Sequence, residues 1–236
     1  MQIMIEVNEA PVAESAVYHE LLPLRGARIV ELGCGAAAHT RAIAETGLPA
    51  EILACEVDTI QHEKNLAIAD LPNVTFVHAG AESIPADDAS ADIVMMFKSL
   101  HHVPQASMGQ ALREIARVLR PGGLAYISEP VYAGDFNEVL RLFHDERAVR
   151  EAAFRAVCEA VDGGVLELVE QHFFNTRNDF VDFDEFSRRI IGVTHTDHRL
   201  SAEQTEHVRD KFNGYMGPDG ARFVMPIRVD LLQRPL

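Results

Sequence analysis

The sequence predicts a doubly wound α/β fold with a mostly parallel sheet, and three observations support this prediction. Short β-rich runs alternate with helical patterns along the first 130 residues. Most of these runs are apolar throughout, as expected of strands that helices cover on both faces. The chain has 236 residues, of which 47% are hydrophobic, enough for one large domain with a substantial core. We therefore expect a single α/β domain.

The parallel part of the sheet is expected from five strand-like runs: residues 28–32, 51–55, 74–78, 92–97 and 124–128. Helical patterns lie between them at 36–46, 60–71 and 108–119. The third pattern repeats apolar residues with a period of 3.6 and ends before Pro121-Gly122-Gly123. Strand, helix and strand in this order predict parallel pairing.

After residue 130 the pattern changes to a helical cap and a closing strand. A long helix is expected over 136–161, a strand over 165–174, and shorter helices over 184–191 and from Ser201, where Gln204 completes a capping box. The final run, 223–231, alternates apolar and polar residues and predicts an antiparallel strand. Pro226 argues against a central position for it. The expected division is a core at 12–130, a cap region with one strand at 131–222, and a closing strand at 223–236.

Composition excludes several classes of protein. The net charge of −15 stays negative even if all 11 histidines are charged, which disfavours nucleic acid as a partner. The cysteines, Cys34, Cys55 and Cys158, form no CxxC pair, so we expect neither disulfides nor a thiolate metal site. The sequence shows no secretory leader and no run of about 18 apolar residues that would span a membrane. We expect a cytoplasmic protein without a membrane partner.

The strongest motif is VELGCGAAA at residues 30–38, where the first strand turns into the first helix. Glycine at 33 and 35 permits a tight turn and close approach of a ligand, and the helix that follows presents free N–H groups. Glycines here could also form a turn without a ligand. The pattern GxGxxA fits a dinucleotide fingerprint as well, so the loop alone does not name its ligand.

Three further features narrow the choice of ligand. Glu31 places a carboxylate at the end of the first strand, where it favours a cationic amine and repels a pyrophosphate. Glu56 follows the second strand, 21 residues after Gly35, at the place from which a carboxylate accepts ribose hydroxyls. Asp58 is the nearby competitor for that role. The turn at 80–85 (GAESIP) can offer backbone groups to a purine edge.

Together these motifs resemble the class I S-adenosylmethionine-dependent methyltransferases, in particular their small-molecule branch. The resemblance rests on VELGCG at 30–35, CEVD at 55–58, GAESIP at 80–85, ADIVMMFKSLHHV at 91–103 and LREIARVLRPGGLAYISEP at 112–130. It covers roughly residues 12–130 and implies a Rossmann-like sheet, S-adenosylmethionine as cofactor and methyl transfer to a small molecule. It also implies that the last strand lies inside the sheet, whereas Pro226 argues against this position, so the place of that strand stays open. Two positions depart from the family: Gly80 stands where many relatives carry an acid, and Lys98 where many carry a small or amide residue.

The resemblance and the strand ends together imply a set of site residues. The cofactor-binding residues are expected to be Glu31, Gly33, Cys34, Gly35, Glu56, Val57, Ala81, Glu82, Phe97 and Lys98. The residues expected at the acceptor are His102 and Glu129 for catalysis and Tyr18, Lys98 and Tyr132 for binding. Structural roles compete with each assignment: His102 can belong to a helix start, and Tyr18 can be a core anchor. No metal is expected, because HxxH at 195–198 also suits an ordinary loop.

Lys98 raises an electrostatic question, since an ammonium beside a sulfonium needs a carboxylate between them. The cofactor's own carboxylate, Glu129 or an acidic group on the substrate would supply it, and the last would make the substrate anionic. Two rival functions remain open at this stage: a nicotinamide-dependent oxidoreductase, and a protein that binds S-adenosylmethionine without turnover. The expected partner is a small-molecule substrate, and a homodimer is left open by the sequence.

Overall fold

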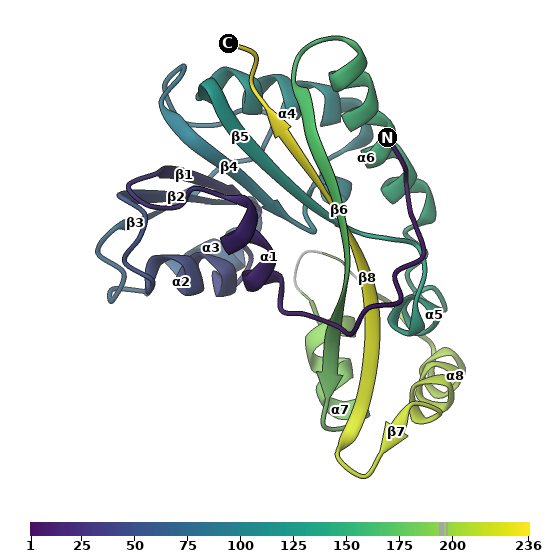
Figure 1. The fold of residues 1–236 in the computed structure, drawn as a ribbon. Helices are drawn as coiled ribbons and strands as arrows, with labels where there is room; N and C mark the ends of the chain where they lie inside the picture. The colour runs from purple at the N-terminus through teal and green to yellow at the C-terminus, as the bar shows by residue number, and fades with distance from the viewer. Residues whose placement is uncertain (194–195, 197) are drawn as a thin grey trace.

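The computed structural model describes residues 1–236 except 194, 195 and 197. Its centre is a sheet whose eight described strands comprise seven in the order β3-β2-β1-β4-β5-β8-β6 and the short β7, which pairs with β8 (Figure 1). The strands are β1 (Arg28–Leu32), β2 (Glu51–Glu56), β3 (Val74–His78), β4 (Ala91–Phe97), β5 (Leu119–Pro130), β6 (Glu167–Phe180), β7 (Met216–Gly217) and β8 (Gly220–Gln233). Strands β1 to β5 pair in parallel, and the order reverses at β1, which confirms the doubly wound α/β prediction.

Helices cover both faces of this sheet. They are α1 (Glu14–Leu21), α2 (Ala38–Ala44), α3 (Thr59–Asn65), α4 (Gln105–Val118), α5 (Asp135–Leu140), α6 (Arg147–Asp162), α7 (Phe183–Phe186) and α8 (Ala202–Asn213), with the single turns η1 (Leu100–His102) and η2 (Ser187–Ile191). Strand β4 shows the two faces: Val94 and Met96 pack in the cluster with α4 and α6, while Ile93 and Met95 pack in the cluster with α1 and α2. Covered faces explain why these strands are apolar throughout.

The closing strand β8 lies inside the sheet, between β5 and β6, and is antiparallel to both. The antiparallel direction was predicted correctly. Of the two positions left open, the strand takes the one inside the sheet that the family resemblance implies, and not the one that Pro226 favoured. The pairing with β5 ends at Pro130 opposite Ile227, and Val131 N–H donates to the Pro226 carbonyl at 2.9 Å. In an antiparallel pair, the N–H and C=O groups of one residue point to the same neighbouring strand. The N–H that Pro226 lacks would therefore have pointed to Val131, just past the end of β5. The proline therefore interrupts no ladder bond of β5.

The helix expected over 136–161 is in fact two helices, α5 and α6, separated by residues 141–146. This stretch contains no glycine or proline that would signal the break. Glu146 is the N-cap residue of α6, and its carboxylate is tied to Arg150 and His144. The expected strand at 165–174 extends to Phe180, and the short β7 is a second strand in a region where one was expected.

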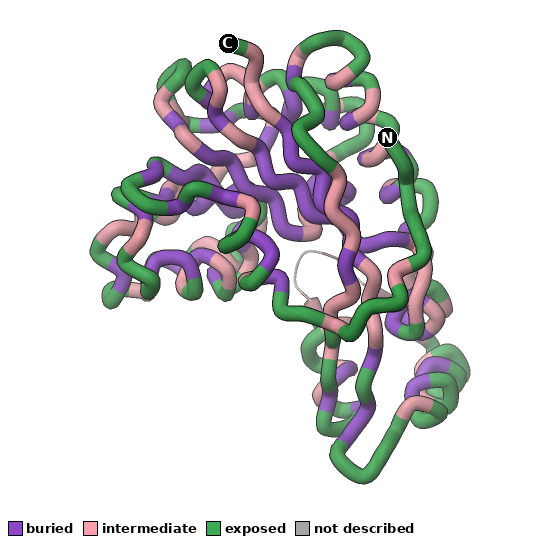
Figure 2. Tube along the Cα trace, viewed as in Figure 1, coloured by how far each residue is buried: buried purple, intermediate pink, exposed green. Residues whose placement is uncertain are grey.

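The long strands β6 and β8 continue beyond β5 as a two-stranded arm, at the bottom of Figure 1. Helices α5, α7 and α8 pack around this arm through a third hydrophobic cluster that is separate from the two at the main sheet. Figure 2 shows that burial is densest in the main sheet and more scattered along the arm. No helix in the described part of the chain is long and apolar enough to cross a bilayer.

Candidate functional site

The glycine loop connects β1 to α2 at the carboxyl edge of the sheet. Gly33 and Gly35 have φ of +72° and +53°, which glycine adopts without strain. The N–H groups of Gly33 and Cys34 donate to the Cys55 carbonyl at 2.9 and 3.0 Å, which ties the loop to β2. A Cβ at Gly33 would lie 2.7 Å from that of Ser99, whereas a Cβ at Gly35 would meet nothing within 4 Å. The loop is therefore closely packed at its first glycine and open at its second.

Glu56 is the carboxylate that joins this loop to the end of β2. Its Oε2 accepts the Gly35 N–H at 2.7 Å, and its Oε1 accepts the N–H groups of Val57 and Asp58 at 2.8 and 2.9 Å. Asp58 serves a different purpose: it caps α3 by accepting the N–H of Ile60 at 2.9 Å. A carboxylate offers about four lone-pair directions, so Glu56 keeps acceptor capacity for another donor.

Glu31 is buried at the end of β1, only 2% exposed. Burial raises the pKa of this carboxyl to about 7, although the hydroxyl of Thr40, which donates at 2.6 Å, works against the shift. The charge of Glu56 raises the pKa further. A cation placed beside Glu31 would favour its charged form.

Gly80, in the turn after β3, is one of the two positions that depart from the family pattern. The carboxylate of Glu82 occupies the space that a side chain at position 80 would enter. The turn therefore carries an acidic side chain at position 82, whereas many relatives carry one at the position of Gly80. Ala81 is buried in the main core, while Val57, across the edge after β2, is 58% exposed. Both residues remain expected cofactor contacts.

An aromatic group lies at the end of β4. Phe97 stacks on the His39 ring with centroids 4.0 Å apart, and Tyr18 packs edge-on against Phe97 at 5.7 Å. Burial lowers the pKa of His39 to about 4. Tyr18 is completely buried, which agrees with its alternative role as a core anchor. Burial, together with the charge of Glu31, raises the pKa of its hydroxyl to about 12. Within the described part of the chain this hydroxyl has no hydrogen-bond partner.

Lys98 is paired with a carboxylate that the sequence analysis did not consider. Its Nζ donates to Glu14 Oε2 at 2.6 Å, and the Ser128 hydroxyl donates to the other oxygen of Glu14. Glu14 is the first residue of α1 and is buried. An acidic substrate is therefore not needed to balance the charge of Lys98.

Glu129 is bonded to His101, the first histidine of the motif, whereas His102 and Glu129 were the residues expected at the acceptor. Glu129 Oε2 lies 2.5 Å from His101 Nδ1, and its Oε1 accepts the Leu100 N–H at 2.9 Å. Burial alone would lower the pKa of His101, but Glu129 and Glu146 outweigh burial and raise this pKa to about 9. His102 is exposed beside it. The bond to Glu129 therefore holds His101, a residue that was not among the predicted site residues.

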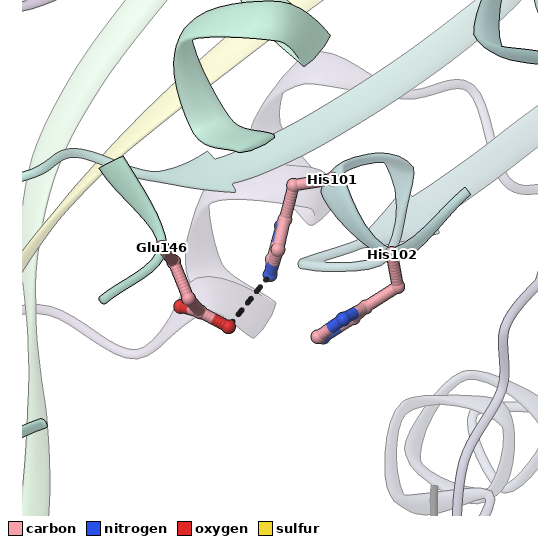
Figure 3. Close-up of side chains that lie close together, drawn as sticks. All are labelled: His101, His102 and Glu146. Carbon is pink, nitrogen blue, oxygen red and sulfur yellow. Dashed lines mark ion pairs between the residues drawn. The ribbon is translucent and has the colours of Figure 1, made fainter. Parts of the chain in front are cut away.

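A second carboxylate faces His101 from the cap (Figure 3). Glu146 Oε1 lies 3.6 Å from His101 Nε2 and 3.0 Å from His144 Nε2, and its Oε2 is 2.6 Å from Arg150 Nη2. One ligand atom from each of His101, His102 and Glu146 lies within 4.8 Å of the others. No metal-ligating set was expected here.

Tyr132 and the two histidines of the HxxH pattern are the remaining residues that the sequence analysis singled out. Tyr132 is half-buried, with the Arg147 guanidinium 4.6 Å above its ring. His198 packs edge-on against His144 at 4.7 Å, while His195 lies outside the described residues.

Glu14, His101 and Glu146 were missed by the sequence analysis. The HH pair drew attention to this place, but it does not say which ring is buried. No local signal in the sequence points to Glu14 or Glu146, because their partners are distant along the chain.

A parallel sheet with a glycine loop after β1 and an acid after β2 defines the nucleotide-binding half of a doubly wound enzyme fold. Comparison with known protein families narrows the class of enzyme: residues 30–127 match the family described as a methyltransferase domain. An uncharacterized methyltransferase of Mycobacterium tuberculosis is 39% identical over 103 residues, 44% of this chain and 40% of that protein. Residues 30–127, about two fifths of the chain, are therefore similar to the methyltransferase domains of known proteins.

Two further proteins are similar to the chain. The 27-O-demethylrifamycin SV methyltransferase of Amycolatopsis mediterranei is 37% identical over 107 residues, 44% of this chain and 39% of that protein. The matched region thus spans about two fifths of the length of these relatives. A putative methyltransferase from Bacillus halodurans shares the fold, with a TM-score of 0.64 and 16% identity over 94% of this chain and 98% of that one.

The resemblance to methyltransferases implies S-adenosylmethionine as the cofactor, and the residues present fit it. The space in front of Gly35 leaves the loop open to a ligand, and Glu56 beside it retains acceptor capacity. Glu31 is a buried carboxylate with a raised pKa, which a cationic amine would stabilise in its charged form. A pyrophosphate would be repelled at the same place.

Proposed function

We propose that this protein transfers a methyl group from S-adenosylmethionine to a small-molecule acceptor in the cytoplasm. The observation that carries the proposal is the bond between the glycine loop and Glu56, at the edge of the sheet that also bears Glu31. The relative from Amycolatopsis, by its name a methyltransferase for a small molecule, supports this class of acceptor. The acidic composition argues against nucleic acid as the acceptor.

The cofactor-binding part of the proposal divides the work among the residues around the loop. Glu56 accepts the ribose hydroxyls, and Glu31 orients the amine. The backbone of the glycine loop lies against the methionine part, and the turn that contains Ala81 and Glu82 lies against the base. Cys34, Val57, Phe97 and Lys98 complete the lining of this site.

The acceptor part of the proposal uses the ends of β4 and β5. When bound, S-adenosylmethionine supplies a methyl group already activated by its sulfonium, so the protein mainly positions the acceptor in line and excludes water. His102 is exposed at this edge and contacts the acceptor, together with Tyr132. Glu129 is buried behind His101 and acts by positioning it. Tyr18 packs under this edge and Lys98 anchors α1 to it, so both shape the site.

The first experiment asks which nucleotide the protein binds. S-adenosylmethionine and S-adenosylhomocysteine should raise the melting temperature, because a ligand at 100 times its dissociation constant adds about 2.7 kcal/mol of stability. NAD and NADP should leave it unchanged. Stabilisation by NAD alone would favour the oxidoreductase instead.

Two variants then test the ribose-binding carboxylate. Glu56→Ala should weaken S-adenosylhomocysteine binding by about 1.5–3 kcal/mol in calorimetric titration, the scale of hydrogen bonds to a charged group. Asp58→Ala is the matched control: it should cost about 1 kcal/mol of stability through loss of the α3 cap, with little effect on binding. A larger binding loss for Asp58→Ala would overturn the assignment.

Turnover separates an enzyme from a binding protein. Formation of S-adenosylhomocysteine in the presence of a small-molecule library is expected. Tight cofactor binding with no acceptor in that library would favour the non-catalytic alternative.

A further inference from the structure

The cluster of His101, His102 and Glu146 brings metal-ligating side chains together from two parts of the chain. The two histidines belong to η1, after β4, and Glu146 stands at the start of α6. Figure 3 shows their side chains converging, with the His101 ring between the other two. Their nearest ligand atoms all lie within 4.8 Å of one another. The methyltransferase domain does not require such a group, because its cofactor already activates the methyl group.

His101 is held in the way that metal-binding proteins hold a ligating imidazole. Its Nδ1 is bonded to Glu129 at 2.5 Å, which leaves Nε2 directed at Glu146. A carboxylate on the far nitrogen fixes the ring and raises its basicity as a ligand. Glu129 is itself anchored by the Leu100 N–H at 2.9 Å, so the ring is oriented before any ion arrives.

Glu146 is oriented just as firmly. Arg150 binds its Oε2 through Nη2 at 2.6 Å and Nε at 3.1 Å, so Oε1 is the oxygen that faces the histidines. The distance from this oxygen to His101 Nε2 is 3.6 Å. Two ligands about 2.1 Å from a tetrahedral zinc ion lie about 3.4 Å apart, so the observed separation is close to that of a ligand pair.

The cluster also provides charge and access for an ion. Two buried carboxylates, Glu129 and Glu146, face it; Glu129 is bonded to His101, and Glu146 is bonded to Arg150. His102 is exposed, and the side chain of His144, 3.0 Å from Glu146, is 30% exposed. An ion can therefore enter from solvent, and a position remains for a small ligand.

We propose that His101, His102 and Glu146 bind one zinc ion, with a coordination position left open on the side of the proposed acceptor. Two imidazoles and one carboxylate form a donor set that catalytic zinc sites use. The open position suits a small ligand with a hydroxyl or carbonyl oxygen, whose electrons the ion would polarise. His102 would then contact the acceptor through the metal. Binding of the ion itself does not depend on the proposed methyl transfer.

The test uses the full chain, without a histidine tag, stripped with chelator and dialysed against zinc. Mass spectrometry of the metal content should find one zinc per chain, and cobalt(II) in its place should give the visible absorption of a four- or five-coordinate ion. His102→Ala and Glu146→Gln should each weaken zinc binding at least tenfold. Glu129→Gln should weaken it by 10- to 100-fold, the effect of removing a carboxylate behind a ligating histidine.

Controls keep these results interpretable. His207→Ala, at an exposed position on α8, should leave zinc affinity unchanged. His102 is also exposed, so its variant is expected to fold, which circular dichroism and melting would verify. Less than a tenth of an equivalent of zinc in the wild type, or unchanged zinc affinity in His102→Ala, would overturn the proposal and leave the cluster a metal-free ion-pair network. Cofactor binding, measured on the same samples, reports separately on the methyltransferase proposal.

Discussion

Glu31 is a buried carboxyl group at the proposed cofactor site, and its charge state depends on pH and on what binds beside it. It is buried, it accepts a hydrogen bond from Thr40 at 2.6 Å, and its pKa is raised to about 7. At neutral pH the ligand-free protein is therefore divided between the neutral and charged forms of this carboxyl. A bound cationic amine would shift the balance to the charged form.

From the raised pKa of Glu31 we expect the free energy of unfolding to depend on pH. A glutamate in the unfolded chain has its ordinary pKa of 4.5, so between pH 4.5 and about 7 the folded state binds more protons than the unfolded state. Stability then falls as pH rises through this window, and the loss is complete above pH 7. Relative to Glu31→Gln, whose amide oxygen still accepts from Thr40, the ligand-free wild type should lose about 2–3 kcal/mol between pH 5 and pH 8.

Urea denaturation of both proteins at several pH values measures this difference. The glutamine variant is its own control, because the other titrating groups contribute equally to both proteins. A difference that does not change with pH would mean that Glu31 titrates near its ordinary value.

At the scale of elements, α1 is fastened to the sheet by a buried polar contact. Glu14 at its first turn bonds Lys98, just after β4, and Ser128 in β5. Val17 and Tyr18 on the same helix pack into the cluster with Ile43 of α2. The helix thus covers the sheet beside the glycine loop through both a charged and an apolar contact.

Removing the cation of this contact should destabilise the fold. Lys98→Met leaves the buried carboxylate of Glu14 with the Ser128 hydroxyl and, 3.9 Å away, His39 Nε2, without the ammonium that now balances its charge. The substitution should lower the free energy of unfolding by about 1–3 kcal/mol. The estimate is below that for a fully buried pair because the Lys98 side chain is 31% exposed.

Arg28→Met is the matched control for Lys98→Met. Arg28 pairs with Glu51 at 3.3 Å, but both side chains are more than 60% exposed, so the cost should stay below about 1 kcal/mol. Chemical denaturation of both variants makes the comparison. An unchanged stability of Lys98→Met, with a raised KM for an anionic acceptor, would instead support the substrate role first expected of Lys98.

At the scale of the whole molecule, the apolar interior is divided between the main sheet and the arm. Two clusters line the faces of the main sheet, and the third surrounds the outer parts of β6 and β8. Phe223 is fully buried in this third cluster, with ring centroids 5.5 Å from Phe212 and 5.9 Å from Phe180. The arm therefore has a core of its own, away from the glycine loop.

Phe223→Ala should cost about 3–5 kcal/mol of stability, the usual range for removing a buried aromatic ring. Affinity for S-adenosylhomocysteine should stay within about threefold of the wild type wherever the variant is folded, because the cofactor edge belongs to the other clusters. Val181→Ala, at a position 72% exposed on the same arm, should change stability by less than about 0.5 kcal/mol. A large fall in cofactor affinity for Phe223→Ala would show that the arm and the cofactor edge are coupled.

The local features of this protein could be predicted from its sequence. Alternation of strands and helices, the glycine loop, and the capping box at Ser201 all arise from residues close together along the chain. Hydrophobic periodicity and the freedom of glycine at positive φ act over a few residues, so the sequence displays them directly.

Only the tertiary structure decided which distant groups meet. Lys98 bonds Glu14, 84 residues away, and Glu129 bonds His101, 28 residues away. Glu146 faces His101 because the chain breaks into two helices where the periodicity predicted one, and β8 enters the sheet although Pro226 argued against it. These outcomes depend on how packed elements bring buried charges to partners, since a buried charge without one is costly. Spacing along the chain does not encode that geometry.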